Sequence, residues 1–146
     1  MEMPVFRVEE LKVRIGGRYV IDEVSFDIHG GEVLALVGES GSGKTLTGLA
    51  AMDLLPESSC REKGRIFLEG TDIFTLRKEA KRRIRGKEIS MVFQEPFTAM
   101  NPVMRVGSQI QEALDAHFDM PRADSSKLIC DIIRSVRLDQ VVLNSR

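Results

Sequence analysis

The chain has 146 residues, of which 42% are hydrophobic and 29% charged, with a net charge of −1. This is enough apolar material for the core of one domain or of part of a larger one. The near-neutral charge argues against a protein that binds nucleic acid through an overall positive surface. No apolar run reaches the roughly 18 residues of a membrane-spanning helix, and residues 1–4 do not resemble a signal peptide.

Cys60 and Cys130 lie far apart without the spacing of a metal site. We therefore expect two reduced thiols that serve as packing residues in a cytosolic protein.

In the first third of the chain, the residue pattern predicts two strands and a turn that leads into another strand. Apolar residues alternate with polar ones over residues 11–15 and again over 24–28, which is typical of half-buried strands. Gly16-Gly17 separates the two runs, and Gly30-Gly31 turns the chain into the continuous apolar run 33–37. We expect that run to be a buried parallel strand, so the fold class is α/β with antiparallel N-terminal strands.

The most informative motif follows this run. Residues 38–45 match the pattern G-x-x-x-x-G-K-[ST] of a P-loop, and residues 46–55 predict the helix that should follow it, closed by Pro56. Glycines let such a loop curl so that backbone N–H groups point at phosphate oxygens, and the helix N-terminus adds its positive dipole. The predicted phosphate-binding residues are Gly38, Glu39, Ser40, Gly41, Ser42, Gly43, Lys44 and Thr45. Lys44 should reach the β- and γ-phosphates, and the Thr45 hydroxyl should bind Mg²⁺.

The remainder predicts strands over residues 64–70 and 88–93, a charged helix over 76–85, and two amphipathic helices, one from about residue 106 to 117 and one over 123–136. The basic cluster 81–87 could bind a polyanion. A solvated helix face is the commoner explanation, and no aromatic residue interleaves the cluster to stack on bases, so we expect no nucleic-acid partner. The strand over 88–93 delivers Gln94 to its end.

Residues 91–102, MVFQEPFTAMNP, add a more specific signal. With the P-loop, they resemble the ATP-binding subunits of ABC transporters, and more narrowly the oligopeptide/dipeptide/nickel importer branch. That branch has the form F-Q-D/E-P-x-T/S-x-x-N-P, followed by a stretch like residues 104–107, MRVG. The resemblance covers essentially the whole chain and implies a P-loop NTPase fold of the ABC ATPase type. It divides the chain into an N-terminal part of the nucleotide-binding core, 1–103, and the start of a helical subdomain, 104–146.

The resemblance also implies a site and partners. Residues 38–45 would hold ATP, and Gln94 would be the Q-loop glutamine that contacts Mg²⁺ and the attacking water; an uncharged amide suits that position because it offers both an acceptor and a donor. The family places an aromatic residue near Ile15 to stack on adenine, and Tyr19 is the nearest candidate here. The implied partners are transmembrane permease subunits, a second ATPase subunit and, indirectly, a solute-binding protein, at the cytoplasmic face of the membrane.

Nothing in the chain matches the signature motif, the Walker B aspartate with its catalytic glutamate, or the switch histidine of that family. We therefore expect the N-terminal part of an ABC ATPase, with the rest of the domain absent, which binds ATP but hydrolyses it poorly. We also expect an unpaired apolar strand edge in the isolated chain. Two alternatives stay open: a non-hydrolysing nucleotide-binding module, and a small P-loop kinase, for which the basic cluster would be a poor lid because it precedes a strand.

Overall fold

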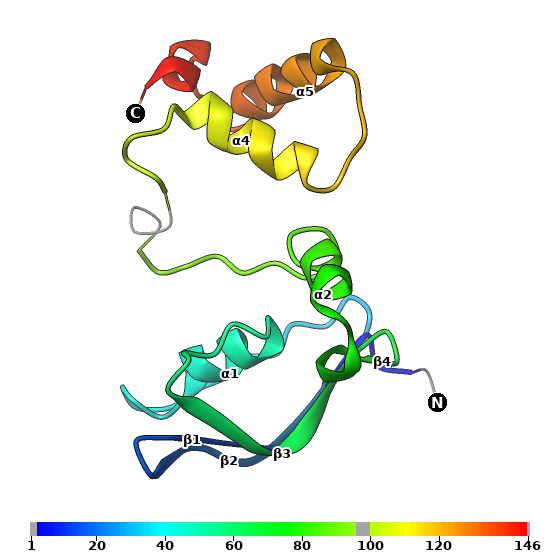
Figure 1. The fold of residues 1–146 in the computed structure, drawn as a ribbon, viewed down its shortest axis with the longest axis vertical. Coiled ribbons are helices and arrows are strands. Elements are labelled where there is room, and N and C mark those ends of the chain that lie inside the picture. Colours follow the sequence, from blue (N-terminus) through cyan, green and yellow to red (C-terminus); the bar gives the residue numbers. More distant parts are fainter. Residues whose placement is uncertain (1–2, 96–99, 146) are drawn as a thin grey trace. The chain divides into compact units, whose positions relative to one another are not determined.

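The computed structural model describes residues 3–95 and 100–145, in two compact units, Met1–Arg85 and Gly86–Arg146. The first unit contains a sheet and short helices, and the second is helical (Figure 1). The elements of the first unit are β1 (Phe6–Ile15), β2 (Arg18–Ile28), α1 (Lys44–Ala51), β3 (Ser59–Leu68), β4 (Thr71–Asp72), η1 (Ile73–Thr75) and α2 (Lys78–Ile84). Those of the second are α4 (Val106–Asp115), α5 (Arg122–Ser135) and η2 (Gln140–Asn144).

The sheet has the order β2-β1-β3-β4, and every neighbouring pair is antiparallel. β1 and β2 form the predicted hairpin, in which Ile15 pairs with Arg18. Its two-residue loop is Gly16-Gly17, with φ of 56° and 82°. Two consecutive residues with positive φ make the turn whose twist matches that of the flanking strands, and glycine adopts it without strain. The prediction of two antiparallel N-terminal strands is confirmed.

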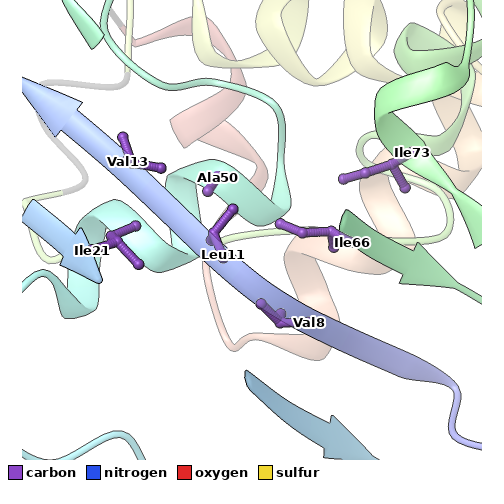
Figure 2. Close-up of a cluster of buried hydrophobic side chains, with 7 residues drawn as sticks. All are labelled: Val8, Leu11, Val13, Ile21, Ala50, Ile66 and Ile73. Carbon is purple, nitrogen blue, oxygen red and sulfur yellow. The ribbon is translucent and has the colours of Figure 1, made fainter. Parts of the chain in front are cut away.

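One face of the sheet packs on helix α1. The buried cluster joins side chains from three strands to α1 and η1 (Figure 2). Its members are Val8, Leu11, Val13, Ile21, Ala50, Ile66 and Ile73. Ala50 is the contribution of α1, and its small side chain allows the helix to lie close to the strands.

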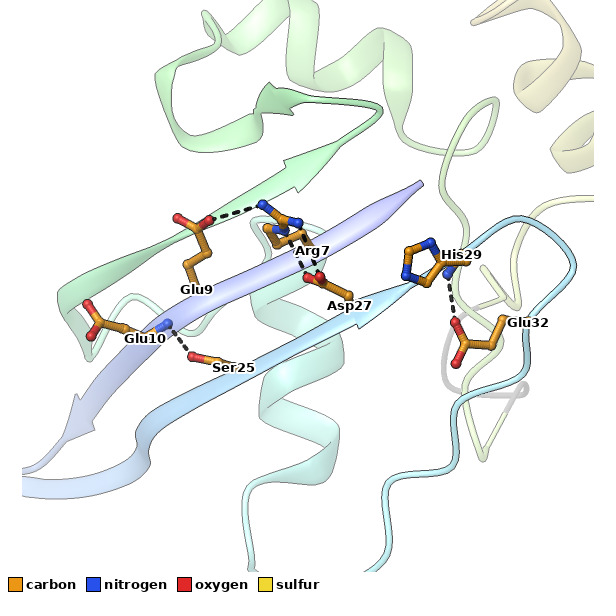
Figure 3. Close-up of polar contacts among 7 residues, drawn as sticks. All are labelled: Arg7, Glu9, Glu10, Ser25, Asp27, His29 and Glu32. Atoms are coloured by element: carbon orange, nitrogen blue, oxygen red, sulfur yellow. Dashed lines mark hydrogen bonds and ion pairs between the residues drawn. The ribbon is translucent and has the colours of Figure 1, made fainter. Parts of the chain in front are cut away.

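A band of irregular pairing crosses the middle of the sheet. Glu10 in β1 and Glu23 in β2 have positive φ, and the β1 register shifts beside them. Gly64 in β3 faces this band with φ of 100°, and a Cβ there would lie 2.5 Å from Leu11 Cα. The amide of Glu10 donates to Ser25 Oγ at 2.8 Å instead of to a strand partner (Figure 3). The bulges therefore bend the sheet while satisfying an N–H group that would otherwise be unpaired.

Two predicted strands are absent from the described chain. Residues 33–37 and 88–93 form no strand; only Ile89 makes an isolated bridge, with its carbonyl accepting from the Gly86 amide at 2.8 Å. Val33 and Val37 are each 93% exposed, whereas Leu34 and Leu36 are 38% and 44% exposed. This alternation is that of an extended strand, but a strand also needs a neighbour for its N–H and C=O groups, and no described segment supplies one.

Helix α1 begins and ends earlier than predicted. It closes in a Schellman motif, in which Asp53 N–H donates to Ala50 O and Leu54 N–H donates to Leu49 O. Asp53 occupies the left-handed position of this motif, with φ of 51°. The helix therefore stops before Pro56, which the sequence predicted as its end.

The second unit is a pair of helices covered by η2. The predicted stripe of α5 is confirmed in part, because Ile129 and Ile133 are buried while Leu128 and Ile132 remain 38% and 42% exposed. Ser125 is fully buried, and its hydroxyl donates to Gln111 Oε1 of α4 at 3.0 Å. This hydrogen bond satisfies a polar group between the two helices.

Candidate nucleotide phosphate site

The site begins at the end of β2, where the chain leaves the sheet. Glu32 N–H donates to His29 O at 3.0 Å, and His29 N–H donates to the Glu32 carboxylate at 2.7 Å (Figure 3). Gly31 has φ of 75°, which this turn requires. The turn confirms the prediction at Gly30-Gly31, and it directs residues 33–37 toward the glycine-rich loop.

The loop itself owes its shape to three glycines. Gly41 and Gly43 have φ of 82° and 91°, values that side chains rarely allow. Gly38 lies against Ser42, so that a Cβ at Gly38 would be 2.7 Å from Ser42 Oγ. The most demanding contact is at Gly43, because a Cβ there would lie 2.3 Å from the backbone oxygen of Val20 in β2. Gly43 therefore lets the start of α1 rest directly on the sheet.

The N-terminus of α1 is prepared for an anion. Its N-cap is Gly43, no side chain caps it, and its first turn contains no acidic residue. The first N–H groups of a helix have no partner within the helix, so here they are available to a bound group, and the helix dipole favours negative charge. Further on, Thr47 N–H and its hydroxyl both donate to Gly43 O, at 2.8 and 3.0 Å, which fixes the first turn.

Lys44 lies folded over the loop. Its Nζ donates to Gly38 O and Glu39 O, both at 2.7 Å, and to Ser42 Oγ at 3.1 Å. The ammonium group is thus held at the centre of the loop by neutral oxygens. Phosphate oxygens would be stronger acceptors because they are charged. The geometry therefore fits a phosphate group.

Thr45 is exposed at the first turn of α1, beside Lys44. A hydroxyl at this position suits Mg²⁺, which is normally held by one or two protein oxygens together with substrate phosphates and water. The described residues contain no cluster of three or more His, Cys, Asp or Glu side chains that could hold a metal ion. Magnesium that arrives with a nucleotide needs no such cluster. Glu39 and Ser40 are exposed on the loop.

Gln94 is exposed and belongs to the second unit, whereas the P-loop belongs to the first. Its contact with the magnesium site therefore stays a prediction. Most of the segment that gives the family resemblance its specificity, residues 96–99, lies outside the described residues. The predicted division at residue 103 also stays a prediction. The boundary between the two compact units is a different one, between Arg85 and Gly86.

Tyr19 lies on the charged face of the sheet. It pairs with Arg14, and cross-strand partners share a face, whereas the neighbouring Val13 is in the core. Its hydroxyl donates to Glu62 at 2.8 Å, and Lys12 Nζ lies 4.4 Å from the centre of its ring. The hydrogen bond to Glu62 is the main reason that the pKa of Tyr19 is raised. These contacts hold the Tyr19 side chain on this face of the sheet, and its stacking on adenine stays a prediction.

Sequence reasoning missed Gln109 of α4. Its side chain accepts from Asn101 N–H at 2.9 Å and donates to Asn101 O and Met104 O, at 3.0 and 3.2 Å. Gln109 therefore fixes residues 101–104, which lie shortly after residues 96–99. The Asn-Pro dipeptide at 101–102 predicts a turn, but it does not indicate which side chain stabilises that turn.

An extended segment, a glycine loop and a helix with an uncapped N-terminus together define a P-loop nucleotide-binding protein. Comparison with known proteins gives the family. Residues 21–143 match the ABC transporter family, so the chain belongs to that family.

Named relatives place the chain near peptide transport proteins. It is 35% identical to the probable D,D-dipeptide transport ATP-binding protein DdpD of Escherichia coli (strain K12), covering 97% of this chain and 45% of that protein. It is 39% identical to the peptidoglycan transport ATP-binding protein YejF of Agrobacterium fabrum, covering 91% of this chain and 25% of that protein. The chain thus spans less than half the length of these curated relatives.

The fold agrees with solved ABC cassettes. The dimeric structure of MJ0796, a bacterial ABC transporter cassette, matches with a TM-score of 0.80 at 18% identity, over 97% of this chain and 61% of that chain. Its post-hydrolysis state, bound to ADP and Pi, matches with a TM-score of 0.76 at 17% identity, over the same shares. The predicted fold class, an α/β ABC ATPase fold that the chain covers in part, is confirmed. Among the described residues, no helix combines the length and apolar character needed to cross a bilayer.

Proposed function

We propose that the chain is the ATP-binding part of an ABC importer subunit for peptides or a related small solute. The observation that carries the proposal is the loop over residues 38–45, which leaves the first N–H groups of α1 without a cap and places the Lys44 ammonium at its centre. The family match and the peptide transport names of the relatives support the transporter class and the class of solute, and the direction rests on the resemblance of residues 91–102 to the importer branch.

In this proposal, the residues have separate roles. The backbone N–H groups of Gly41 and of residues 43–45 bind the β- and γ-phosphates, while the Ser42 N–H donates to Glu39 O at 3.2 Å within the loop. Lys44 exchanges the carbonyls of Gly38 and Glu39 for phosphate oxygens. Thr45 and Gln94 supply two oxygens to the Mg²⁺ that accompanies the nucleotide. Bound Mg²⁺ would neutralise phosphate charge and orient the γ-phosphate.

Residues 1–146 by themselves are expected to turn ATP over slowly. Hydrolysis needs a group that orients the attacking water, and the sequence has no match to the Walker B carboxylates that supply it in the family. The remaining partners are also proposals: permease subunits, a second ATPase subunit that completes each site, and an indirect solute-binding protein, at the cytoplasmic face of the membrane.

Calorimetric titration with Mg-ATP tests the proposal. We expect Lys44→Ala to weaken binding by about ten- to a hundredfold, because a hydrogen bond to a charged group contributes roughly 1.5–3 kcal/mol. Lys127→Ala serves as the control, since Lys127 is exposed in the second unit. Phosphate release measured in the same samples should be negligible. Equal binding by wild type and Lys44→Ala would refute the site, and phosphate transfer to an added acceptor would favour a kinase.

A further inference from the structure

Helix α2 and its flanking residues carry a net positive charge, whereas the rest of the chain carries a net negative charge. Residues 77–85 contain six Lys and Arg and one Glu, a net charge of +5. Because the whole chain has a net charge of −1, the remaining residues carry −6. A small positive patch on an otherwise acidic chain creates a directional field, which the overall charge conceals.

One side of α2 is anchored to the first unit. Lys81 Nζ forms an ion pair with Asp53 Oδ2 at 2.8 Å, and Ile84 packs against the core cluster. Arg85 Nε donates to Lys81 O at 3.2 Å. Positions 81, 84 and 85 lie on one side of a helix. These contacts hold α2 on the first unit and leave Arg82 and Arg83 on the opposite side of the helix.

The exposed cations of this stretch form what we term the basic face: Arg77 and Lys78 at the start of α2, and Arg82 and Arg83 on the side away from the anchored residues. All four are exposed. In the part of the chain that the structure describes, no carboxylate lies within 4.0 Å of any of them, including Glu79 in the same helix.

The charged face of the sheet behaves differently. Arg7 pairs with Asp27 at 2.9 Å, Lys12 with Asp22 at 2.8 Å, and Arg14 with Glu62 at 2.9 Å. These three positive side chains of the same unit are thus neutralised. The basic face is positive and unneutralised, which fits an anionic partner.

The chemistry of the partner follows from what the basic face lacks. Binding to single-stranded nucleic acid relies on aromatic side chains that stack on bases, and residues 77–85 include none. The nearby Phe74 ring is covered by the Arg61 guanidinium, 4.0 Å from the ring centre. A lipid surface requires only clustered positive charge on an exposed element.

We propose that the basic face of α2 docks on the anionic phospholipid headgroups of a membrane. This inference rests on the proposed transporter function, and it adds a direct contact between the chain and the bilayer. The negative charge of the remaining residues disfavours other orientations, so binding should present α2 to the membrane. It should also weaken as salt is added, because exposed charges are screened over about 10 Å at 0.1 M ionic strength.

Co-sedimentation with vesicles tests this proposal. The vesicles are phosphatidylglycerol mixed with phosphatidylcholine, and phosphatidylcholine alone is the uncharged comparison. The variant Arg82→Glu/Arg83→Glu should lose at least about thirtyfold in partitioning to anionic vesicles, given the contribution of each basic residue near such a surface. The matched control Arg122→Glu/Lys127→Glu makes the same change in net charge at exposed residues of α5 and should bind nearly as wild type.

Further measurements keep the outcomes distinct. Arg82→Gln/Arg83→Gln, a milder change, should give an intermediate loss, and circular dichroism should show all variants folded. Mg-ATP binding should be unchanged in the α2 variants, so a failure of nucleotide binding would refute the proposed function without affecting the vesicle result. The membrane proposal is overturned if wild type ignores anionic vesicles, if both double variants bind alike, or if wild type binds an RNA or DNA oligonucleotide more tightly than vesicles.

Discussion

Gly43 offers a sharp test of how the loop is built. Gly43 and the nearby Gly41 both have a left-handed backbone conformation, but of the two only Gly43 lies against the sheet. A Cβ at Gly43 would lie 2.3 Å from Val20 O, whereas a Cβ at Gly41 would meet nothing within 4 Å. Gly41→Ala therefore introduces backbone strain alone, and Gly43→Ala introduces the same strain together with a clash against backbone.

The expected costs differ accordingly. An L-residue in the left-handed region costs about 1–2 kcal/mol, so Gly41→Ala should lower the free energy of unfolding by that amount. The clash at Gly43 cannot be relieved by a side-chain rotation, and forcing extra atoms into a packed site costs typically 1–3 kcal/mol more. Gly43→Ala should therefore destabilise the first unit by about 2–5 kcal/mol in all.

Urea unfolding followed by tyrosine fluorescence measures this difference. Tyr19 is the only tyrosine and the chain has no tryptophan, so the signal reports on β2 and the first unit alone. A local probe is needed because a chain with two compact units need not unfold in one step. If Gly43→Ala and Gly41→Ala were equally stable, the close approach of α1 to β2 would be wrong.

Three further predictions concern other parts of the chain. Arg137 occupies the left-handed position after α5, with φ of 60°. Arg137→Gly should therefore raise the free energy of unfolding of the second unit by about 1 kcal/mol, measured by thermal unfolding followed by circular dichroism. The control Lys127→Gly, within α5, should lower it by a similar amount. The hydrogen bond to Glu62 raises the pKa of Tyr19, so its stabilisation is present below the unfolded pKa of about 10 and is lost as pH rises through the folded pKa; in an ultraviolet titration Glu62→Gln should lower the Tyr19 pKa, and an unchanged titration would contradict the contact. Val37 is 93% exposed on an unpaired apolar segment, through which we expect the isolated chain to self-associate. Val37→Lys should reduce that association in analytical ultracentrifugation without loss of stability, and unchanged association would contradict a role for this segment.

The sequence predicted local features well where one or two residues determine the geometry. Gly16-Gly17 specified the hairpin turn, and the spacing of Gly38, Gly43 and Lys44 specified the phosphate loop. These features depend on backbone freedom and on neighbours close in sequence, so a pattern is enough to predict them.

Features that depend on distant partners were harder to predict. Residues 33–37 have the composition of a buried strand, but ladder formation needs a second segment, which composition cannot reveal. The end of α1 was misplaced because Asp53 takes a conformation usually given to glycine. Gln109 was missed because its three hydrogen bonds join residues that sequence alone does not bring together.

The central claim is that residues 38–45 bind nucleotide phosphates. The most direct measurement is the change in backbone amide chemical shifts when Mg-ATP is added to isotope-labelled chain. We expect the largest changes at the amides of residues 41–45, where the loop meets the N-terminus of α1, and their loss in Lys44→Ala. Large changes elsewhere with residues 41–45 unmoved, or no changes at all, would contradict the account.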